Sequence, residues 1–177
     1  AKEEKLADWL LWVQITLQSQ ESTRAFNAVL AQSPEPKKLT LIPAHQTELD
    51  QLGQLISKHA ESEYFARALA RVSEIANLYQ QRGAYDTAIG VLAAFIKAQP
   101  TLRVSEKLEF DIVQIHLQKA QQAFTDRPVK TKPPEKLLPE SQATIDAIAA
   151  YLKAHPTSPN AAQALQTLLQ IARTYGE

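Results

Sequence analysis

Hydrophobic residues recur along most of this chain at steps of three and four, a spacing that predicts α-helices. The first stripe predicts a helix at 3–18, and a second, shorter helix is expected at 22–32. The apolar residues of these two helices are Leu6, Trp9, Leu10, Val13, Leu17, Phe26, Val29 and Leu30. Pro34 and Pro36 end the second helix, so 33–43 is predicted to be a connecting loop.

The middle of the chain carries the clearest helical stripes. Thr47 followed by Asp50 resembles a capping box, so a helix is expected from there to about His59. Two stripes then follow, made of Phe65, Ala68, Leu69, Val72, Ile75, Ala76 and Tyr79, and of Tyr85, Ala88, Ile89, Leu92, Phe95 and Ile96. Gly83 separates them and is well placed to end a helix in the left-handed conformation. Because Pro100 closes the second stripe, the pattern predicts two antiparallel helices joined by a tight turn.

Three further helices are expected in the C-terminal part. The segment 104–124 has apolar residues on two sides, which predicts a long helix packed between neighbours. Four prolines with several lysines make 125–139 a predicted loop. Helices at 140–154 and about 160–175 follow. Ser158 is predicted to cap the last one, with the adjacent proline at the first helical position.

The chain repeats itself. Residues 59–79 align without gaps on residues 155–175, an offset of 96 residues. The matched pairs are His59 with His155, Ser62 with Ser158, Ala68-Leu69 with Ala164-Leu165, Ile75-Ala76 with Ile171-Ala172, and Tyr79 with Tyr175. A third, less similar copy begins at Lys97, so the intervals are 40 and 56 residues. The longer interval contains the loop at 125–139, which we interpret as an insertion into one repeat.

Residues 69–102 resemble a tetratricopeptide repeat (TPR). A small residue, Ala76, lies where that family needs helices to approach closely, and Tyr79, Gly83, Tyr85, Ala88 and Pro100 have the family's spacing. The resemblance implies an all-α fold of antiparallel helical hairpins, stacked as a short α-solenoid of seven or eight helices. It implies one helical-repeat domain over 1–177. The segment 151–161 is similar to bacterial envelope proteins such as outer-membrane assembly lipoproteins, which favours the periplasm or envelope over the cytoplasm.

Composition excludes several classes of function. Lys plus Arg and Asp plus Glu are each 19, so the formal net charge is zero, and no basic excess points to nucleic acid. The chain has no Cys, which excludes disulfides and thiolate sites. No apolar run approaches the length of a membrane span. Met is absent even from the first position, so we expect a processed chain or a fragment of a larger protein.

Candidate chemistry is sparse. The four histidines are His45, His59, His116 and His155, and no two have metal-ligand spacing. His59 and His155 lie at equivalent helix ends, where a histidine favours the helix dipole. The four glycines are scattered, so no phosphate-binding loop is expected. We therefore predict no catalytic, metal or cofactor site. Lys130, Lys132 and Lys136 read as part of a linker, or alternatively as a docking patch for an acidic partner.

The leading hypothesis is a scaffold or adaptor that binds a protein or peptide. In TPR-like arrays the first helix of each repeat lines a concave surface, so polar residues beside the core stripe are candidates for binding. They are Glu74, Asn77 and Gln81, with the repeat counterparts Gln114, Gln170 and Arg173. The alternative reading is that these are ordinary surface positions of a Gln-rich chain. The alternative function is a non-catalytic helical domain of a larger enzyme or secretion machine, which positions substrate or neighbouring domains.

The last predicted helix lacks the partner helix that follows its better-matched copy. We expect some of its apolar residues, such as Leu165, Leu168 or Ile171, to be incompletely covered. An open apolar end of a repeat array promotes association. The sequence therefore predicts either a further helix beyond Glu177 or self-association through the C-terminal end.

Overall fold

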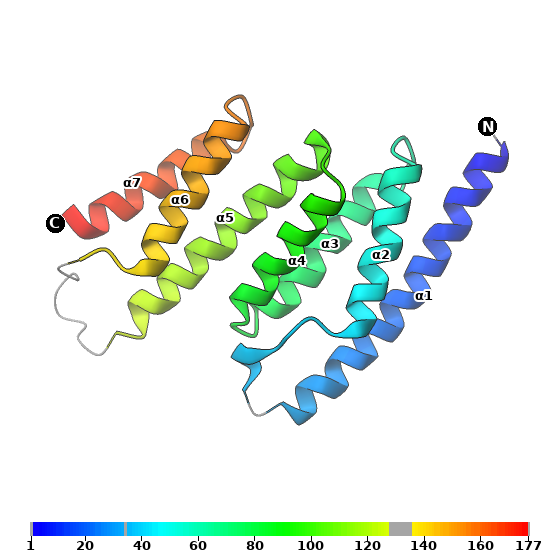
Figure 1. Cartoon of the computed structure of the whole chain (residues 1–177), viewed down its shortest axis with the longest axis horizontal. Coiled ribbons are helices and arrows are strands. Elements are labelled where there is room, and N and C mark those ends of the chain that lie inside the picture. The colour runs from blue at the N-terminus through cyan, green and yellow to red at the C-terminus, as the bar shows by residue number, and fades with distance from the viewer. Residues whose placement is uncertain (1, 34, 128–135, 177) are drawn as a thin grey trace. The chain divides into compact units, whose positions relative to one another are not determined.

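The computed structural model describes residues 2–33, 35–127 and 136–176 and consists there of helices joined by turns and loops (Figure 1). Within these ranges it contains seven α-helices, one short 3₁₀ helix and no strand. The α-helices are α1 (Lys2–Gln32), α2 (Pro43–Lys58), α3 (Phe65–Gln80), α4 (Tyr85–Ala98), α5 (Leu102–Thr125), α6 (Pro139–Ala154) and α7 (Ala161–Gly176), and the 3₁₀ helix is η1 (Pro36–Lys38). The all-α prediction is confirmed.

The prediction of two separate N-terminal helices is wrong, because α1 continues through both. The threonines close to the predicted break do not end the helix. Their hydroxyls bond back to carbonyls one turn earlier, since Thr16 Oγ1 donates to Trp12 O at 2.9 Å and Thr23 Oγ1 donates to Ser19 O at 2.8 Å. Such side chains remain within a helix when this bond satisfies them.

Two predicted helix starts also need correction. The helix expected at Thr47 begins at Pro43, which takes the first helical position, and Thr47 Oγ1 donates to Pro43 O at 3.1 Å instead of capping. Near the other start, Ser158 Oγ does accept a hydrogen bond from a backbone amide, that of Asn160, at 3.1 Å. However, α7 begins only at Ala161, so the proline at 159 precedes the helix.

The two predicted loops have different outcomes. The loop at 33–43 contains η1 and ends where α2 begins. The loop at 125–139 is bounded by the last residue of α5 and the first residue of α6, but 128–135 lie outside the described residues. The tight turn at Gly83 is confirmed, with a φ of 76°. The amides of Gly83 and Ala84 bond to Gln80 O and Tyr79 O, which satisfies the end of α3.

The chain divides into two compact units, Ala1–Val104 and Ser105–Glu177. In the first unit α1 packs on α2, α2 on α3, and α3 on α4. Its core includes Leu52, Leu55, Val72, Ile75, Ala76, Tyr79 and Leu92. In the second unit α6 packs on α7, and α5, α6 and α7 share a core of Phe110, Val113, Ile148, Tyr151, Ala164 and Ile171. The stripe predicted on α3 is thus a buried face, whereas Leu6, Leu10 and Leu17 of the first predicted stripe are exposed on α1.

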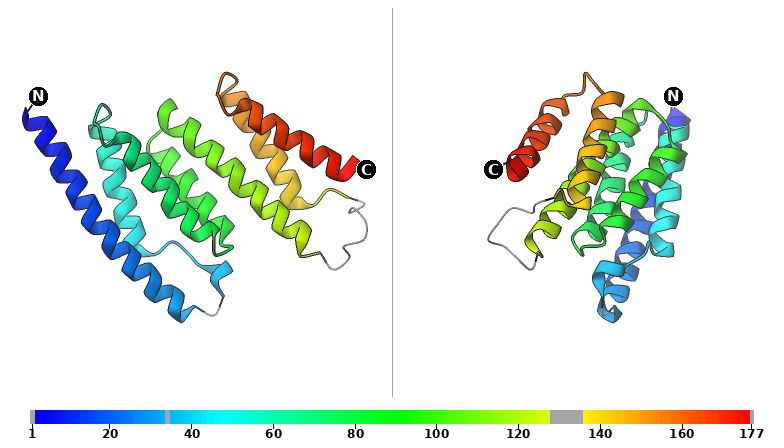
Figure 2. Two further views of the ribbon diagram at one scale, coloured as in Figure 1. Left: turned by 180° about the vertical axis from the view of Figure 1, so that it is seen from behind. Right: turned by 60° about the vertical axis from the view of Figure 1, so that its left-hand side comes forward.

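The α2–α3 hairpin is repeated by the α6–α7 hairpin, and both pairs of helices begin and end 96 residues apart (Figure 2). The residue after the first helix has the same conformation in each copy, with φ and ψ of −132° and 51° at His59 and −130° and 59° at His155. Gln99, after α4, adopts −129° and 67°. The offsets of 40 and 56 residues found in the sequence therefore recur at three helix ends.

Candidate functional site

A buried hydroxyl ties α3 to the segment before α2. Tyr79 Oη accepts a hydrogen bond from Ile42 N at 3.0 Å and lies 2.9 Å from His45 Nδ1. The donor and acceptor roles of the hydroxyl and Nδ1 depend on the imidazole tautomer, and the other ring nitrogen, Nε2, is buried without a hydrogen-bond partner. Burial lowers the pKa of His45 to about 4, although nearby Glu48 acts to raise it. The imidazole is therefore neutral at neutral pH.

An enclosed ion pair lies in the same unit. Glu48 is fully buried and accepts hydrogen bonds from Arg71 Nε at 2.7 Å and Arg71 Nη2 at 3.3 Å. Arg71 Nη1 also donates to Glu74 Oε2 at 3.1 Å. Burial disfavours the guanidinium charge, but the hydrogen bonds and charges of the two carboxylates raise the pKa of Arg71 above its ordinary value. Both groups are satisfied by each other, so we assign them a structural role.

The second unit has a counterpart of the buried tyrosine hydroxyl, with a serine in place of the histidine. Tyr175 Oη lies 2.8 Å from Ser141 Oγ and 3.4 Å from Leu138 N, which are the counterparts of His45 and Ile42 at the offset of 96. Among these residues, neither copy has a catalytic triad, in which a nucleophile bonds to a histidine and the histidine bonds to a carboxylate. In the part of the chain that the structure describes, no group of three or more metal-ligating side chains could hold a metal ion.

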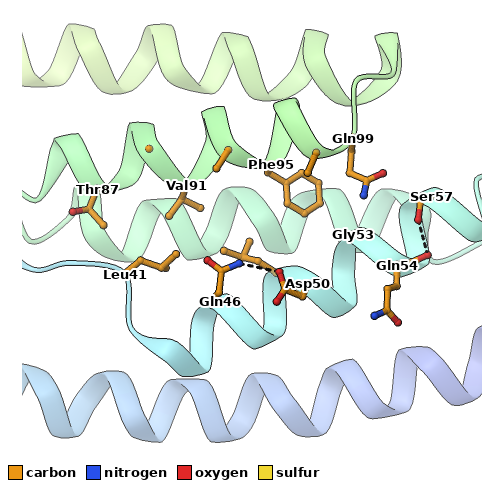
Figure 3. A pocket seen from close by; sticks show the side chains of 14 residues that line it. Leu41, Gln46, Asp50, Gly53, Gln54, Ser57, Thr87, Val91, Phe95 and Gln99 are labelled. Atoms are coloured by element: carbon orange, nitrogen blue, oxygen red, sulfur yellow. Dashed lines mark hydrogen bonds between the residues drawn. The ribbon is translucent and has the colours of Figure 1, made fainter.

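A groove of about 430 Å³ lies between α2 and α4 (Figure 3). We call it the α2/α4 groove. One helix contributes Gln46, Leu49, Asp50, Gly53, Gln54 and Ser57, the other contributes Thr87, Gly90, Val91, Ala94, Phe95 and Ala98, and Leu41 and Gln99 complete the lining. Each set follows the spacing of a single helix face. The groove therefore runs along both helices.

The α2/α4 groove has an apolar floor and a polar rim. Leu49, Val91 and Phe95 are buried at its base, whereas Gln46 and Asp50 are exposed and joined by a hydrogen bond of 2.8 Å from Gln46 Nε2 to Asp50 Oδ1. Asp50 is the one charged side chain among the lining residues. An apolar stripe with a cation at its edge would complement this surface.

The wall that α4 contributes is low. Gly90, Ala94 and Ala98 are exposed and recur every four residues along this helix. A Cβ atom placed on Gly90 would meet no other atom within 4 Å. Small side chains of this kind allow the backbone of a partner to approach closely.

Each of the two units also has a smaller hollow. One, of about 300 Å³, lies between α1 and α3 and is lined by Trp12, Ile15, Thr16, Ser19, Arg67, Ala70, Arg71 and Glu74. The other, of about 240 Å³, lies among α5, α6 and α7 and is lined by Leu117, Ala120, Gln121, Phe124, Thr125, Ser141, Gln170, Ile171, Thr174 and Tyr175. Glu74 and Gln170, which are 96 residues apart, each line one of these hollows, but the other lining residues of α3 and α7 do not correspond at that offset.

The predicted binding residues fall into three groups. Glu74 and Gln170 line the two smaller hollows. The other exposed ones are Asn77 on α3, Gln81 directly after α3 and Arg173 on α7, and none of these lines a described hollow. Gln114 is half-buried in α5, and its Nε2 atom is enclosed without a hydrogen-bond partner. A binding role for these six residues stays a prediction. Of the three lysines considered for docking, Lys136 is exposed, and Lys130 and Lys132 lie outside the described residues.

Sequence reasoning missed the α2/α4 groove. The groove could have been recognised in the sequence from the spacing of Gly90, Ala94 and Ala98, which places three small residues on one side of a helix. The two histidines at helix ends were placed correctly. Each faces a carboxylate of another helix, with His59 Nδ1 at 2.6 Å from Asp8 Oδ1 and His155 Nε2 at 2.9 Å from Glu109 Oε2.

No family model, curated protein or solved structure matches this chain. The resemblance to tetratricopeptide repeats therefore rests on the repeat residues alone. None of the helices within the described ranges is both long and apolar enough to cross a membrane.

Proposed function

We propose that this chain is a non-catalytic scaffold that binds a protein partner, built from stacked antiparallel hairpins of the tetratricopeptide kind. Two observations support the architecture. Adjacent helices of the described chain pack as hairpins, and one hairpin recurs after 96 residues with the same boundaries. The envelope location implied by the resemblance stays a prediction.

The α2/α4 groove is the observation that carries the binding function. A groove with an apolar floor, a polar rim and low walls is suited to the apolar face of an amphipathic helix, whose anchors recur at three- and four-residue steps. Gly90 and Ala94 let the partner helix lie close to α4, while Val91 and Phe95 offer apolar contact at the base. A Lys or Arg beside the partner's apolar stripe would pair with Asp50.

Affinity capture from cells that produce the protein tests this proposal. Ala94→Arg places a long charged side chain in the groove at an exposed position, so it should block binding without unfolding the chain. A protein captured by the wild type should be lost with Ala94→Arg. The matched variant Asn77→Arg/Gln81→Arg adds charge to the exposed side of α3 instead, and it should retain that protein if the groove is the binding surface.

The reverse result identifies the other surface. If Asn77→Arg/Gln81→Arg releases the partner and Ala94→Arg does not, binding occurs on the polar residues predicted from the sequence. If neither the wild type nor any variant captures a specific protein, the scaffold function is wrong. Circular dichroism of each variant should show unchanged helix content, which separates lost binding from lost folding.

A further inference from the structure

The two helices that line the α2/α4 groove run in the same direction. Thr87, in the first turn of α4, donates from its hydroxyl to Leu39 O, which precedes α2, at 2.6 Å. Farther along both helices, a Cβ atom placed on Gly53 would lie 3.2 Å from Gln99 Nε2 and 3.9 Å from the ring of Phe95. The starts of α2 and α4 therefore lie at one end of the groove and their C-terminal ends lie at the other (Figure 3).

Helix α3 packs against both of these helices and runs antiparallel to each. It follows α2 and precedes α4 in the chain, and it contacts both of them. None of its residues lines the groove, so α3 covers a different side of the pair. Helices α1 and α2 also pack on each other in opposite directions (Figure 1). A helix that lay in the groove antiparallel to α2 and α4 would continue this alternation.

The backbone groups at the C-terminal end of the groove favour the same direction. The last carbonyl groups of a helix have no partner within it and form the negative end of the helix dipole. Because α2 and α4 both end there, that end attracts the free N–H groups in the first turn of a bound helix. Lys58 and Lys97 lie in the last turns of the two helices, and they suit the acidic residues that a first turn favours.

A side-chain amide is also available at this end. Gln99 lines the groove, is half-buried and makes no side-chain hydrogen bond within the part of the chain that the structure describes. Gly53 leaves room for the amide, since a Cβ atom at that position would press against it. The amide oxygen of Gln99 can accept a hydrogen bond from a first-turn N–H group, which is what a capping side chain does at the start of a helix.

We propose that the α2/α4 groove holds its partner helix antiparallel to α2 and α4, with the first turn of the partner at Gln99. The inference rests on the proposed function, because it assigns a direction to the same bound helix. The lining residues of α2 and α4 fall within 46–57 and 87–98, and each range is about 17 Å long at the rise of an α-helix. About three turns of the partner therefore contact the groove, with apolar anchors at i, i+4, i+7 and i+11.

Disulfide trapping measures the direction, because the chain has no cysteine of its own. Gly90→Cys and Ala98→Cys each place one thiol at an exposed position of the groove, and the two positions are about 12 Å apart along α4. The probe is a synthetic peptide with blocked ends, with leucines at the four anchor positions, one lysine beside them, and Ala and Gln elsewhere. One version has cysteine in place of the first leucine, and the other has cysteine in place of the last.

Each peptide is equilibrated with each chain variant in a glutathione redox buffer, and mass spectrometry measures the disulfide-linked fraction. Ala98→Cys should trap the peptide with the first cysteine about tenfold more than Gly90→Cys does, because thiols held close together react at a high effective concentration. The peptide with the last cysteine should show the opposite preference. Asn77→Cys, on the exposed side of α3, measures trapping by random collision.

The possible failures are distinguishable. Reversed preferences would mean that the helix binds parallel to α2 and α4, which overturns the inference and leaves the proposed function standing. Equal trapping by the two groove cysteines would also overturn the direction alone. If neither groove cysteine traps more peptide than Asn77→Cys, the groove does not bind an amphipathic helix, and both proposals fail.

A second copy of the chain is the other occupant to test. Light scattering should show a monomer of the wild type at the concentrations used for trapping. A dimer that Ala94→Arg dissociates would show that another copy fills the groove, and it would overturn the assignment to a partner helix. The variants change exposed residues, so circular dichroism should show unchanged helix content for each.

Discussion

Helices α3 and α7 have the same length and matching spacing, yet their surroundings differ. Tyr79 near the end of α3 is fully buried, whereas its counterpart Tyr175 is half-buried. Phe26 packs edge-on against Tyr79 with ring centroids 5.2 Å apart, and Phe124 packs edge-on against Tyr175 at 6.4 Å. The comparison teaches that spacing decides which residues share a side of a helix. The neighbouring helix decides whether that side is core or surface.

The two copies also differ in the polar side chains that they bury at two equivalent positions. Glu48 and Arg71 form a buried ion pair in the first, and their counterparts Thr144 and Thr167 are also buried. Each threonine satisfies its own hydroxyl by donating to a carbonyl of its own helix, at 2.8 Å and 3.0 Å. The second copy is therefore a natural version of the first in which the charge pair has been removed.

The largest effect is expected when this ion pair is broken on one side. Arg71→Thr leaves Glu48 charged and enclosed without its partner, and we expect a loss of about 3–5 kcal/mol in the free energy of unfolding. Glu48→Thr/Arg71→Thr copies the second hairpin and should recover most of that loss. Urea denaturation measures both. If the double variant were as unstable as the single one, the two hairpins would not be interchangeable at this position.

The next largest effect is expected from enlarging an alanine that is buried on α3 and exposed on α7. Ala76→Trp should overpack the contact on α3 and cost about 1–3 kcal/mol or more. Ala172→Trp, at the exposed counterpart, should change stability by no more than about 0.5 kcal/mol. Thermal melting of the two variants is sufficient. Equal shifts in Tm would contradict the claim that only the first copy is covered.

Removing the tyrosine hydroxyls should produce a smaller difference. Tyr79→Phe leaves Ile42 N–H and His45 Nδ1 without their partner in the interior, and one buried unsatisfied group costs about 1–3 kcal/mol. Tyr175→Phe should cost less, because its ring is half-buried and the hydrogen bond that its hydroxyl accepts from Leu138 N is long, at 3.4 Å. Chemical denaturation of both variants checks the order, and a larger loss for Tyr175→Phe would reverse the comparison.

A dependence on pH is expected from position 45, where the second copy has a serine in place of the histidine. The pKa of His45 is about 4 in the folded chain and near 6.5 when unfolded, so between these values the unfolded chain binds more protons. Stability should therefore fall as pH falls through this window, by up to about 1.4 kcal/mol per pH unit from this group. His45→Ser, which copies Ser141, should flatten the profile. An unchanged slope would show that His45 is not buried neutral.

Much of the fold could be predicted because helical spacing is local. The stripes located the helices, the offset of 96 located the repeated hairpin, and Gly83 marked a turn that needs a positive φ. The continuous α1 was missed because polar residues separate the two apolar stripes, whereas the helix continues and the hydroxyls of Thr16 and Thr23 bond within it.

The candidate sites could not be predicted in the same way, because they are formed by residues that are far apart in the sequence. The hydrogen bond between His45 and Tyr79 joins residues 34 apart, and the α2/α4 groove exists only because two helices separated by α3 lie side by side. Glu74 and Gln170 were found because the repeat offset links them, although their hollows also require α1 and α5. Sequence spacing identifies the residues that share a helix side, and it does not identify which helix will face them.

The most direct test of the scaffold function is photo-crosslinking in native cells. A benzophenone amino acid at Ala94 lies in the α2/α4 groove, and the same group at Gln20 on α1 is exposed outside all the described hollows. We predict a discrete adduct with one protein from Ala94, weakened by Asp50→Lys, and no such adduct from Gln20. Absence of an adduct at Ala94, or identical adducts from both positions, would contradict the account.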